Sequence, residues 1–270
     1  MEILQIKGRL GLCFVLFLLL VVSCSENKSA QDIIQSTIDS IEIIESVYFK
    51  QITTRTNPQN GFDTITRFRE MYFERLIGDS IVGVKGHWYM YVEDSVNVIF
   101  EDIYDGKRVV RKNNRDSVAR IYDLDKYPRF RSQHFWGHNT PYSMQYELKY
   151  MLENIDEYLL SRLSDTVISG HPYYQIHWKL EGKSSMPGFM TKLEKNDGWI
   201  SETTLIIDKA TLYPFRMKTK GYMADKPEQG MFFDQTYFDI VFNIDIDQNL
   251  YFNTSLESLS GYEISEMHPK

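Results

Sequence analysis

The chain has 270 residues, of which 30 are Lys or Arg and 37 are Asp or Glu, so its formal net charge is −7. An acidic chain of this kind excludes nucleic acid as an expected partner, because phosphates attract clustered basic residues. Aromatic side chains make up 14% of the residues, which favours β-strands, and the length suits one large domain.

The N-terminal segment is typical of a secretory signal. Lys7 and Arg9 precede an apolar run over residues 10–22, which is shorter than the roughly 20 residues that a membrane-spanning helix needs. The stretch Val21-Val22-Ser23-Cys24 resembles the lipobox of bacterial lipoproteins, which implies that Cys24 is acylated and becomes the first residue of the mature protein. An ordinary cleaved signal and an uncleaved anchor are the alternatives.

This resemblance implies three segments. Residues 1–23 are expected to be the signal peptide, 24–30 a lipidated tether and 31–268 a single domain. The chain contains two cysteines, Cys13 and Cys24, of which the first leaves with the signal and the second carries the lipid. The folded body is therefore expected to lack disulfides, Cys nucleophiles and Cys-based zinc sites.

An amphipathic helix is predicted directly after the tether. Its apolar residues recur at helical spacing between polar ones, which predicts one buried stripe that covers a sheet. The residues of this stripe are Ile33, Ile34, Ile38, Ile41 and Ile44.

Strand-like runs separated by turn signals follow the helix. The short turns, such as Asp105-Gly106, favour an antiparallel meander. The run His87–Val92 is apolar on both faces and is predicted to be a central strand. The predicted strands cover residues 47–56, 64–77, 80–84, 87–92, 96–104 and 108–112.

Residues 127–142 contain two Pro and a Gly and are predicted to form a long irregular loop, a candidate lid. A second helix is predicted over residues 143–163, where Leu148, Met151 and Leu159 share the apolar face. Strands are then predicted at 174–180, 199–208 and 215–222, the last two as a hairpin. A final strand is predicted to place Phe238, Ile240, Phe242, Ile244 and Ile246 on one face.

Three segments carry a resemblance to the LolA/LolB lipoprotein-carrier superfamily. Residues 163–174 resemble the family's junction between the second helix and the next strand, which contains a Gly turn followed by Tyr. Residues 205–216 are similar to a strand of the family that ends in a Lys-Ala-Thr turn, after which Pro and Arg begin the next strand. Tyr237-Phe238-Asp239 resembles its closing strand. The resemblance implies an α+β fold, mainly antiparallel β: a strongly curved half-barrel sheet with two helices packed on its concave side, enclosing an apolar cavity for acyl chains.

Aromatic and Met side chains on the predicted strands are the candidate cavity lining. They form either a cavity for a flexible apolar ligand or a solid core, and the sequence leaves both interpretations open. The candidates are Trp88, Met90, Phe215, Met217, Phe238 and Phe242.

Three arginines on one predicted strand, Arg67, Arg69 and Arg75, are a second group of interest. An inward-facing Arg among apolar neighbours is a candidate for holding a lipid headgroup or ester, whereas the alternative is an exposed, solubilising Arg. His134 and His138 have the spacing of two metal ligands on a helix, but Gly137 and Pro141 argue against that helix. No metal, cofactor or catalytic activity is expected.

The expected function is therefore that of a membrane-anchored envelope lipoprotein that binds a hydrophobic ligand, either a lipid or a lipidated peptide. The alternative is a protein-interaction or scaffold module that meets another envelope protein through a sheet edge or the 127–142 loop. The expected location is the outer membrane, with periplasmic and surface display both open.

Overall fold

The structure is a computed structural model that describes residues 28–57, 63–78, 83–91, 97–123, 141–184 and 193–266. Its strands form one open sheet in the order β12-β6-β5-β4-β3-β2-β1-β11-β10-β9-β8-β7. Neighbouring strands pair antiparallel except for β12, which runs parallel to β6. The strands are β1 (Ser46–Asn57), β2 (Asp63–Arg75), β3 (Val84–Tyr91), β4 (Val98–Tyr104), β5 (Arg108–Asn113), β6 (Val118–Asp123), β7 (Leu159–Ile168), β8 (His171–Ser184), β9 (Glu194–Asp208), β10 (Pro214–Met223), β11 (Lys226–Phe242) and β12 (Glu263–Glu266).

The first helix, α2, spans Ala30–Glu42. Ser29 and Asp32 form a capping box, in which the Asp32 N–H donates to Ser29 Oγ at 3.1 Å and the Ser29 N–H donates to Asp32 Oδ2 at 3.0 Å. This box satisfies backbone donors of the first turn and fixes where the helix begins. The predicted isoleucine stripe of α2 is buried, as expected.

The second helix is shorter than predicted. Helix α4 spans Pro141–Glu153, a 3-10 turn, η3, covers Ile155–Glu157, and β7 then begins at Leu159. The prediction that the helix continues to residue 163 is wrong, because Leu159 and Leu163 pair with Lys179 and Gln175 of β8. These residues have the apolar spacing of a helix but form a strand, because their backbone groups pair with those of β8. The local sequence pattern does not contain this tertiary contact.

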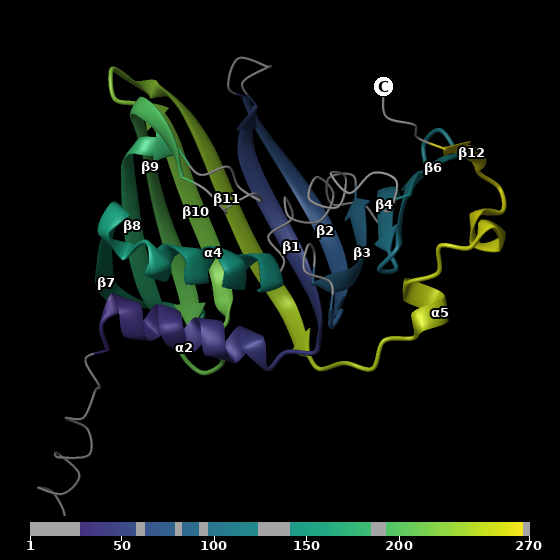
Figure 1. Cartoon of the computed structure of the whole chain (residues 1–270), viewed down its shortest axis with the longest axis horizontal. Helices are drawn as coiled ribbons and strands as arrows, with labels where there is room; N and C mark the ends of the chain where they lie inside the picture. Colours follow the sequence, from purple (N-terminus) through teal and green to yellow (C-terminus); the bar gives the residue numbers. More distant parts are fainter. Residues whose placement is uncertain are drawn as a thin grey trace, which may run out of the picture.

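Helices α2 and α4 lie side by side across one face of the sheet, over β7 to β11 (Figure 1). Their apolar stripes join one core cluster with residues of that face, among them Phe49, Ile176 and Tyr237. The α+β class, with an open curved sheet and both helices on its concave side, is confirmed. Among the described residues, no helix has the length and apolar character needed to cross a membrane.

A β-bulge in β11 changes which side chains of this strand share a face. Tyr237 pairs with Gln51 and Phe242 pairs with Val47, so β11 has one residue more than β1 between these pairs. Asp239, within the bulge, has φ of 53°. One inserted residue reverses the alternation of side chains between the two faces of the strand. The prediction that Phe238 shares a face with Phe242 is therefore wrong.

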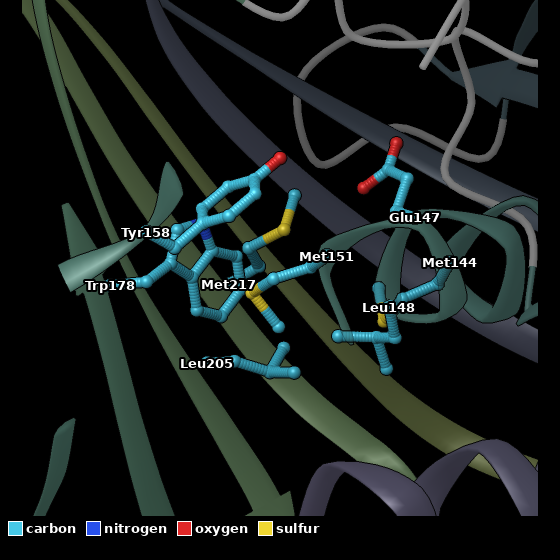
Figure 2. Close-up of a pocket in the computed structure, with 8 residues that line it drawn as sticks. All are labelled: Met144, Glu147, Leu148, Met151, Tyr158, Trp178, Leu205 and Met217. Atoms are coloured by element: carbon cyan, nitrogen blue, oxygen red, sulfur yellow. The ribbon is translucent and has the colours of Figure 1, made fainter. Parts of the chain in front are cut away.

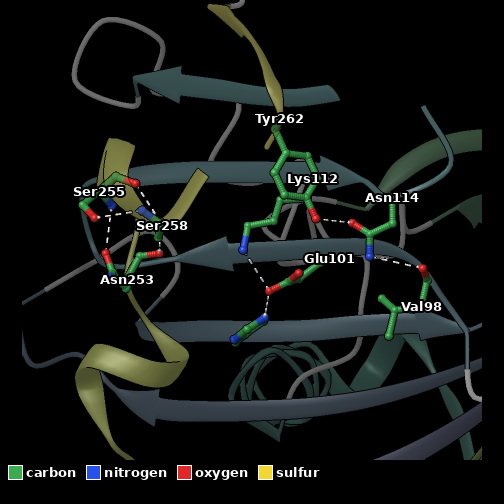
Figure 3. Close-up of polar contacts among 9 residues, drawn as sticks. Val98, Glu101, Lys112, Asn114, Asn253, Ser255, Ser258 and Tyr262 are labelled. Atoms are coloured by element: carbon green, nitrogen blue, oxygen red, sulfur yellow. Dashed lines mark hydrogen bonds and ion pairs between the residues drawn. The ribbon is translucent and has the colours of Figure 1, made fainter. Parts of the chain in front are cut away.

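The chain after β11 crosses the outer face of the other half of the sheet. It contains α5 (Gln248–Tyr251) and η4 (Leu256–Leu259), and it ends in β12, on the far edge (Figure 1). The Tyr262 hydroxyl donates to Asn114 Oδ1 at 2.7 Å, beside the ion pair of Lys112 and Glu101 (Figure 3). The hydrogen bond from Tyr262 to Asn114 and the pairing of β12 with β6 fasten the C-terminal segment to this end of the sheet.

Candidate ligand-binding site

A small apolar cavity lies between α4 and strands β8, β9 and β10 (Figure 2). Met144, Leu148 and Met151 project from successive turns of α4, and Leu205 pairs with Met217 across β9 and β10. The cavity volume is about 20 Å³, which holds about one water molecule. The lining residues are Met144, Glu147, Leu148, Met151, Tyr158, Trp178, Leu205 and Met217.

Two polar groups border this cavity. The Tyr158 hydroxyl and the Glu147 carboxylate point to the same side of it, away from Leu205 (Figure 2). Burial raises the pKa of Glu147 to about 7, and burial together with nearby acidic groups raises the pKa of Tyr158 to about 12. Within the described part of the chain, the buried Tyr158 hydroxyl has no hydrogen-bond partner.

A half-buried cation, Arg69, lies on the same concave face. Its Nη1 donates to Gln51 Oε1 at 2.8 Å and to Thr53 Oγ1 at 3.1 Å, both on β1. Its buried Nε has no partner among the residues that the structure describes. Burial, with the nearby Arg67 and Arg55, lowers the pKa of Arg69 to about 10, so the guanidinium keeps its charge at neutral pH.

Trp88 lies between two guanidinium groups. The Cζ atoms of Arg69 and Arg111 are 6.0 Å and 5.9 Å from the centre of its ring. Arg111 makes two parallel hydrogen bonds to the fully buried Asp102, at 2.8 Å from Nε and 2.5 Å from Nη2. Burial works against the charge of Arg111, but the hydrogen bonds and charge of Asp102 outweigh it and raise the pKa of Arg111. The concave face therefore holds fixed positive charge beside an aromatic ring.

The other two arginines of β2 have different surroundings. Arg75 donates to backbone carbonyls at the end of α2, and its guanidinium lies 4.7 Å from the centre of the Tyr142 ring. Arg67 is half-buried, and burial, with the charge of Arg55, lowers its pKa. Of the three, Arg69 is the one with a buried side-chain nitrogen, Nε, that has no partner among the described residues.

The six candidate lining residues do not all lie on one face. Trp88, Met90 and Met217 belong to the core cluster, and Phe242 packs against it. Phe238 follows the core residue Tyr237 and points to the opposite face. Phe215 stacks on Tyr173, with ring centres 4.8 Å apart. Of the six, Met217 lines the small cavity.

Two residues of the site were not among the sequence candidates. Glu147 stands at the i+3 position of the apolar stripe that Met144, Leu148 and Met151 form, and an acidic residue at such a position is a signal that the sequence does contain. Tyr158 has no such signal, because its position depends on the short η3 turn between α4 and β7.

Other sequence-level candidates lie outside the described residues. These are Cys24, His134, His138 and most of the 127–142 loop. Among the described residues, no group of His, Cys, Asp and Glu side chains is arranged to hold a metal ion.

Comparison with known proteins places the chain beside several solved structures. No family model and no curated protein matches the sequence. LprF from Mycobacterium bovis shares 13% identity at a TM-score of 0.47, over 81% of this chain and 94% of that one. Lipoprotein LppX from Mycobacterium tuberculosis shares 11% at a TM-score of 0.45, over 81% and 97%. A LolA superfamily protein from Nitrosomonas europaea shares 11% at a TM-score of 0.36, over 83% and 97%. The likeness concerns the fold alone.

Proposed function

We propose that this protein is a cell-envelope lipoprotein, anchored through acylated Cys24, that binds a lipid or lipidated peptide on the concave face of its sheet without catalysing a reaction. One observation carries the proposal: a Met-lined apolar site and the half-buried, charged Arg69 share the face that the helices cover. Apolar walls with few placed polar groups are typical of sites for amphipathic ligands.

The cavity of about 20 Å³ is far too small for an acyl chain, so binding requires α4 to move away from the sheet. The lining is suited to such movement, because Met144, Met151 and Met217 have unbranched side chains that repack with little strain. Each methylene that enters contributes about 0.8 kcal/mol, which offsets the cost of separating α4 from the sheet.

Arg69 would orient the ligand. Its Nε donor is buried and has no partner among the described residues, so an ester or phosphate oxygen that reaches it gains a charge-assisted hydrogen bond. Because burial raises its pKa to about 7, Glu147 on α4 would be only partly ionised at neutral pH, which weakens its repulsion of an anionic head.

The test uses native mass spectrometry of the anchored protein, purified gently from membranes. We expect a non-covalently bound lipid that is released on denaturation, whereas the acyl chains on Cys24 remain. Arg69→Met should reduce the amount of retained lipid, and Arg120→Met, which changes an exposed arginine of β6, should not. A wild-type protein that never retains lipid contradicts the proposal.

Anchoring is tested separately. Cys24→Ser should move the protein from the membrane fraction to the soluble fraction, since one or more acyl chains supply the membrane affinity. Protease treatment of whole cells then separates surface display from periplasmic display.

The second candidate is a protein-interaction module, which the outer face of the sheet favours. The hydroxyls of Tyr48, Tyr72 and Tyr91 all donate to the Glu70 carboxylate, at 3.0, 3.1 and 2.7 Å. Tyrosine is enriched at protein interfaces. Loss of a co-purifying envelope protein on Tyr48→Ala, with lipid retention unaffected or absent, would support this candidate.

A further inference from the structure

The two rims of the sheet differ in the side chains that they expose. Because the strands are antiparallel, the ends of β2, β7, β9 and β11 and the starts of β1, β3, β8 and β10 lie at one rim, next to α2 (Figure 1). We call this the α2 rim. The opposite rim carries the β5–β6 and β10–β11 turns.

The α2 rim exposes large apolar side chains at three separate tips. Ile77, in the turn after β2, is 92% exposed; Ile43, at the end of α2, is 75% exposed; and Val167, at the end of β7, is 68% exposed. Backbone contacts place two of these tips together, since the Arg75 N–H donates to the Glu45 carbonyl at 2.7 Å.

The described turns of the opposite rim expose charged side chains, and the apolar side chains near them, Met223 at 37% and Met231 at 46%, are less exposed than the three tips of the α2 rim. The β5–β6 turn contains Arg115 and Asp116, and the β10–β11 turn contains Asp225 and Lys226, all exposed. Isolated exposed apolar residues are common in soluble proteins. The α2 rim also exposes charged side chains, among them Glu42 and Lys107, but it carries the three most exposed large apolar side chains of the described residues.

The point where the chain would reach a bilayer also lies at the α2 rim. Arg162 of β7 donates from Nη1 to the Lys28 carbonyl at 2.6 Å, and the Ser29 cap follows directly. Lys28 is therefore fixed to the folded domain. Three residues lie between it and Cys24, and the four residue steps from Cys24 to Lys28 span at most about 14 Å when fully extended. An acyl anchor on Cys24 holds this corner of the rim close to the membrane surface.

We propose that the α2 rim docks on the lipid bilayer, with Ile43, Ile77 and Val167 in the interfacial layer. This inference rests on the acylation of Cys24 in the proposed function. The occupant is a lipid surface because the anchor brings one within reach of the apolar tips. Burial of these apolar side chains in the interface adds to the membrane affinity that the acyl chains supply. It also fixes the orientation of the sheet relative to the membrane, with the α2 rim toward the lipid.

The test uses single-Cys reporters in the full acylated protein, because the mature body contains no other free thiol once Cys24 is acylated. Ile77→Cys and Val167→Cys report on the α2 rim. Met231→Cys is the matched control, since Met231 is 46% exposed and pairs with Gly221 near the opposite rim. Each is labelled with a nitrobenzoxadiazole dye and reconstituted in phosphatidylethanolamine–phosphatidylglycerol vesicles that contain brominated lipid.

We expect brominated lipid to remove most of the fluorescence at positions 77 and 167 and to leave that at position 231 nearly unchanged. If the protein sediments with the vesicles but all three reporters are equally unquenched, the docking inference is overturned and the anchor stands. The docking inference is also overturned if the fluorescence at positions 77 and 167 changes when a second protein is added but does not change when lipid is added. If the wild-type protein does not sediment and behaves as Cys24→Ser does, both the anchor and the docking fail.

Discussion

Arg75, the last residue of β2, donates from Nη2 to the Ile41 carbonyl at 3.0 Å, so a strand residue caps the C-terminus of helix α2. The same side chain donates to the carbonyls of Glu42 and Ile44. Carbonyls at the end of a helix lack the usual donor one turn further on, although the Ile41 carbonyl also accepts from the Ile44 N–H at 3.1 Å, and a cation at this end favours the helix dipole. Arg75 therefore ties the helix layer to the sheet.

Replacing Arg75 by Met should lower the free energy of unfolding by about 2 kcal/mol, because charge-assisted hydrogen bonds and a favourable dipole interaction are lost together. Chemical denaturation followed by circular dichroism measures the change. Arg120→Met, in an exposed position on β6, should leave stability nearly unchanged. Equal effects of the two substitutions would show that Arg75 has no capping role.

The ion pair of Arg216 and Asp234 has the same geometry as that of Arg111 and Asp102. Arg216 donates two parallel hydrogen bonds to Asp234, at 2.8 and 2.5 Å. The two pairs differ in burial, since the Asp102 side chain is 0% exposed and that of Asp234 is 15% exposed. We expect Asp102→Asn to cost about 3–5 kcal/mol, because it removes the fully buried charge that pairs with the half-buried guanidinium of Arg111. Asp234→Asn should cost about 1 kcal/mol or less. Similar values for both, from urea titrations, would refute this ranking.

Glu147 should make stability depend on pH. Its pKa of about 7 in the folded protein exceeds the 4.5 of a free Glu side chain. Between these two values the folded state binds more protons than the unfolded state, so the contribution of Glu147 to stability falls as pH rises from about 4.5 to 7. Glu147→Gln should remove this part of the slope when unfolding is measured at several pH values. A variant with the slope of the wild-type protein would exclude an elevated pKa.

Gly221 lies under the ring of Trp199 on the neighbouring strand. A Cβ added at Gly221 would stand 2.4 Å from Trp199 Cζ2, so Gly221→Ala must displace the ring. We expect a cost of about 1–3 kcal/mol. The matched control is a double-mutant cycle: in a Trp199→Ala background the same substitution should cost clearly less, and full additivity would disprove the contact.

The helix α2, most of the strands and the absence of a thiol in the body follow from the sequence, because period and composition are local properties. The isoleucine stripe of α2 predicts its buried face, and the 199–208 and 215–222 runs predict the hairpin of β9 and β10. The strand β6 and the C-terminal segment with β12 were not predicted. Val118–Asp123 is short and partly charged, and β12 has four residues, so neither pattern stands out from that of a loop.

The candidate ligand-binding site also combines features that the sequence predicts with features that only the fold decides. The sequence singles out Arg67, Arg69 and Arg75 as one group and also contains the apolar stripe of α4, but it cannot rank the three arginines. Only the pairing of β2 with β1 and its place beneath the helices decide that Arg69 meets Gln51 and Thr53 whereas Arg75 caps α2. Likewise, the bulge at Asp239 reverses the face of Phe238. Local spacing determines which faces are apolar, but burial and partners depend on residues far apart in the chain, and those contacts exist only in the folded protein.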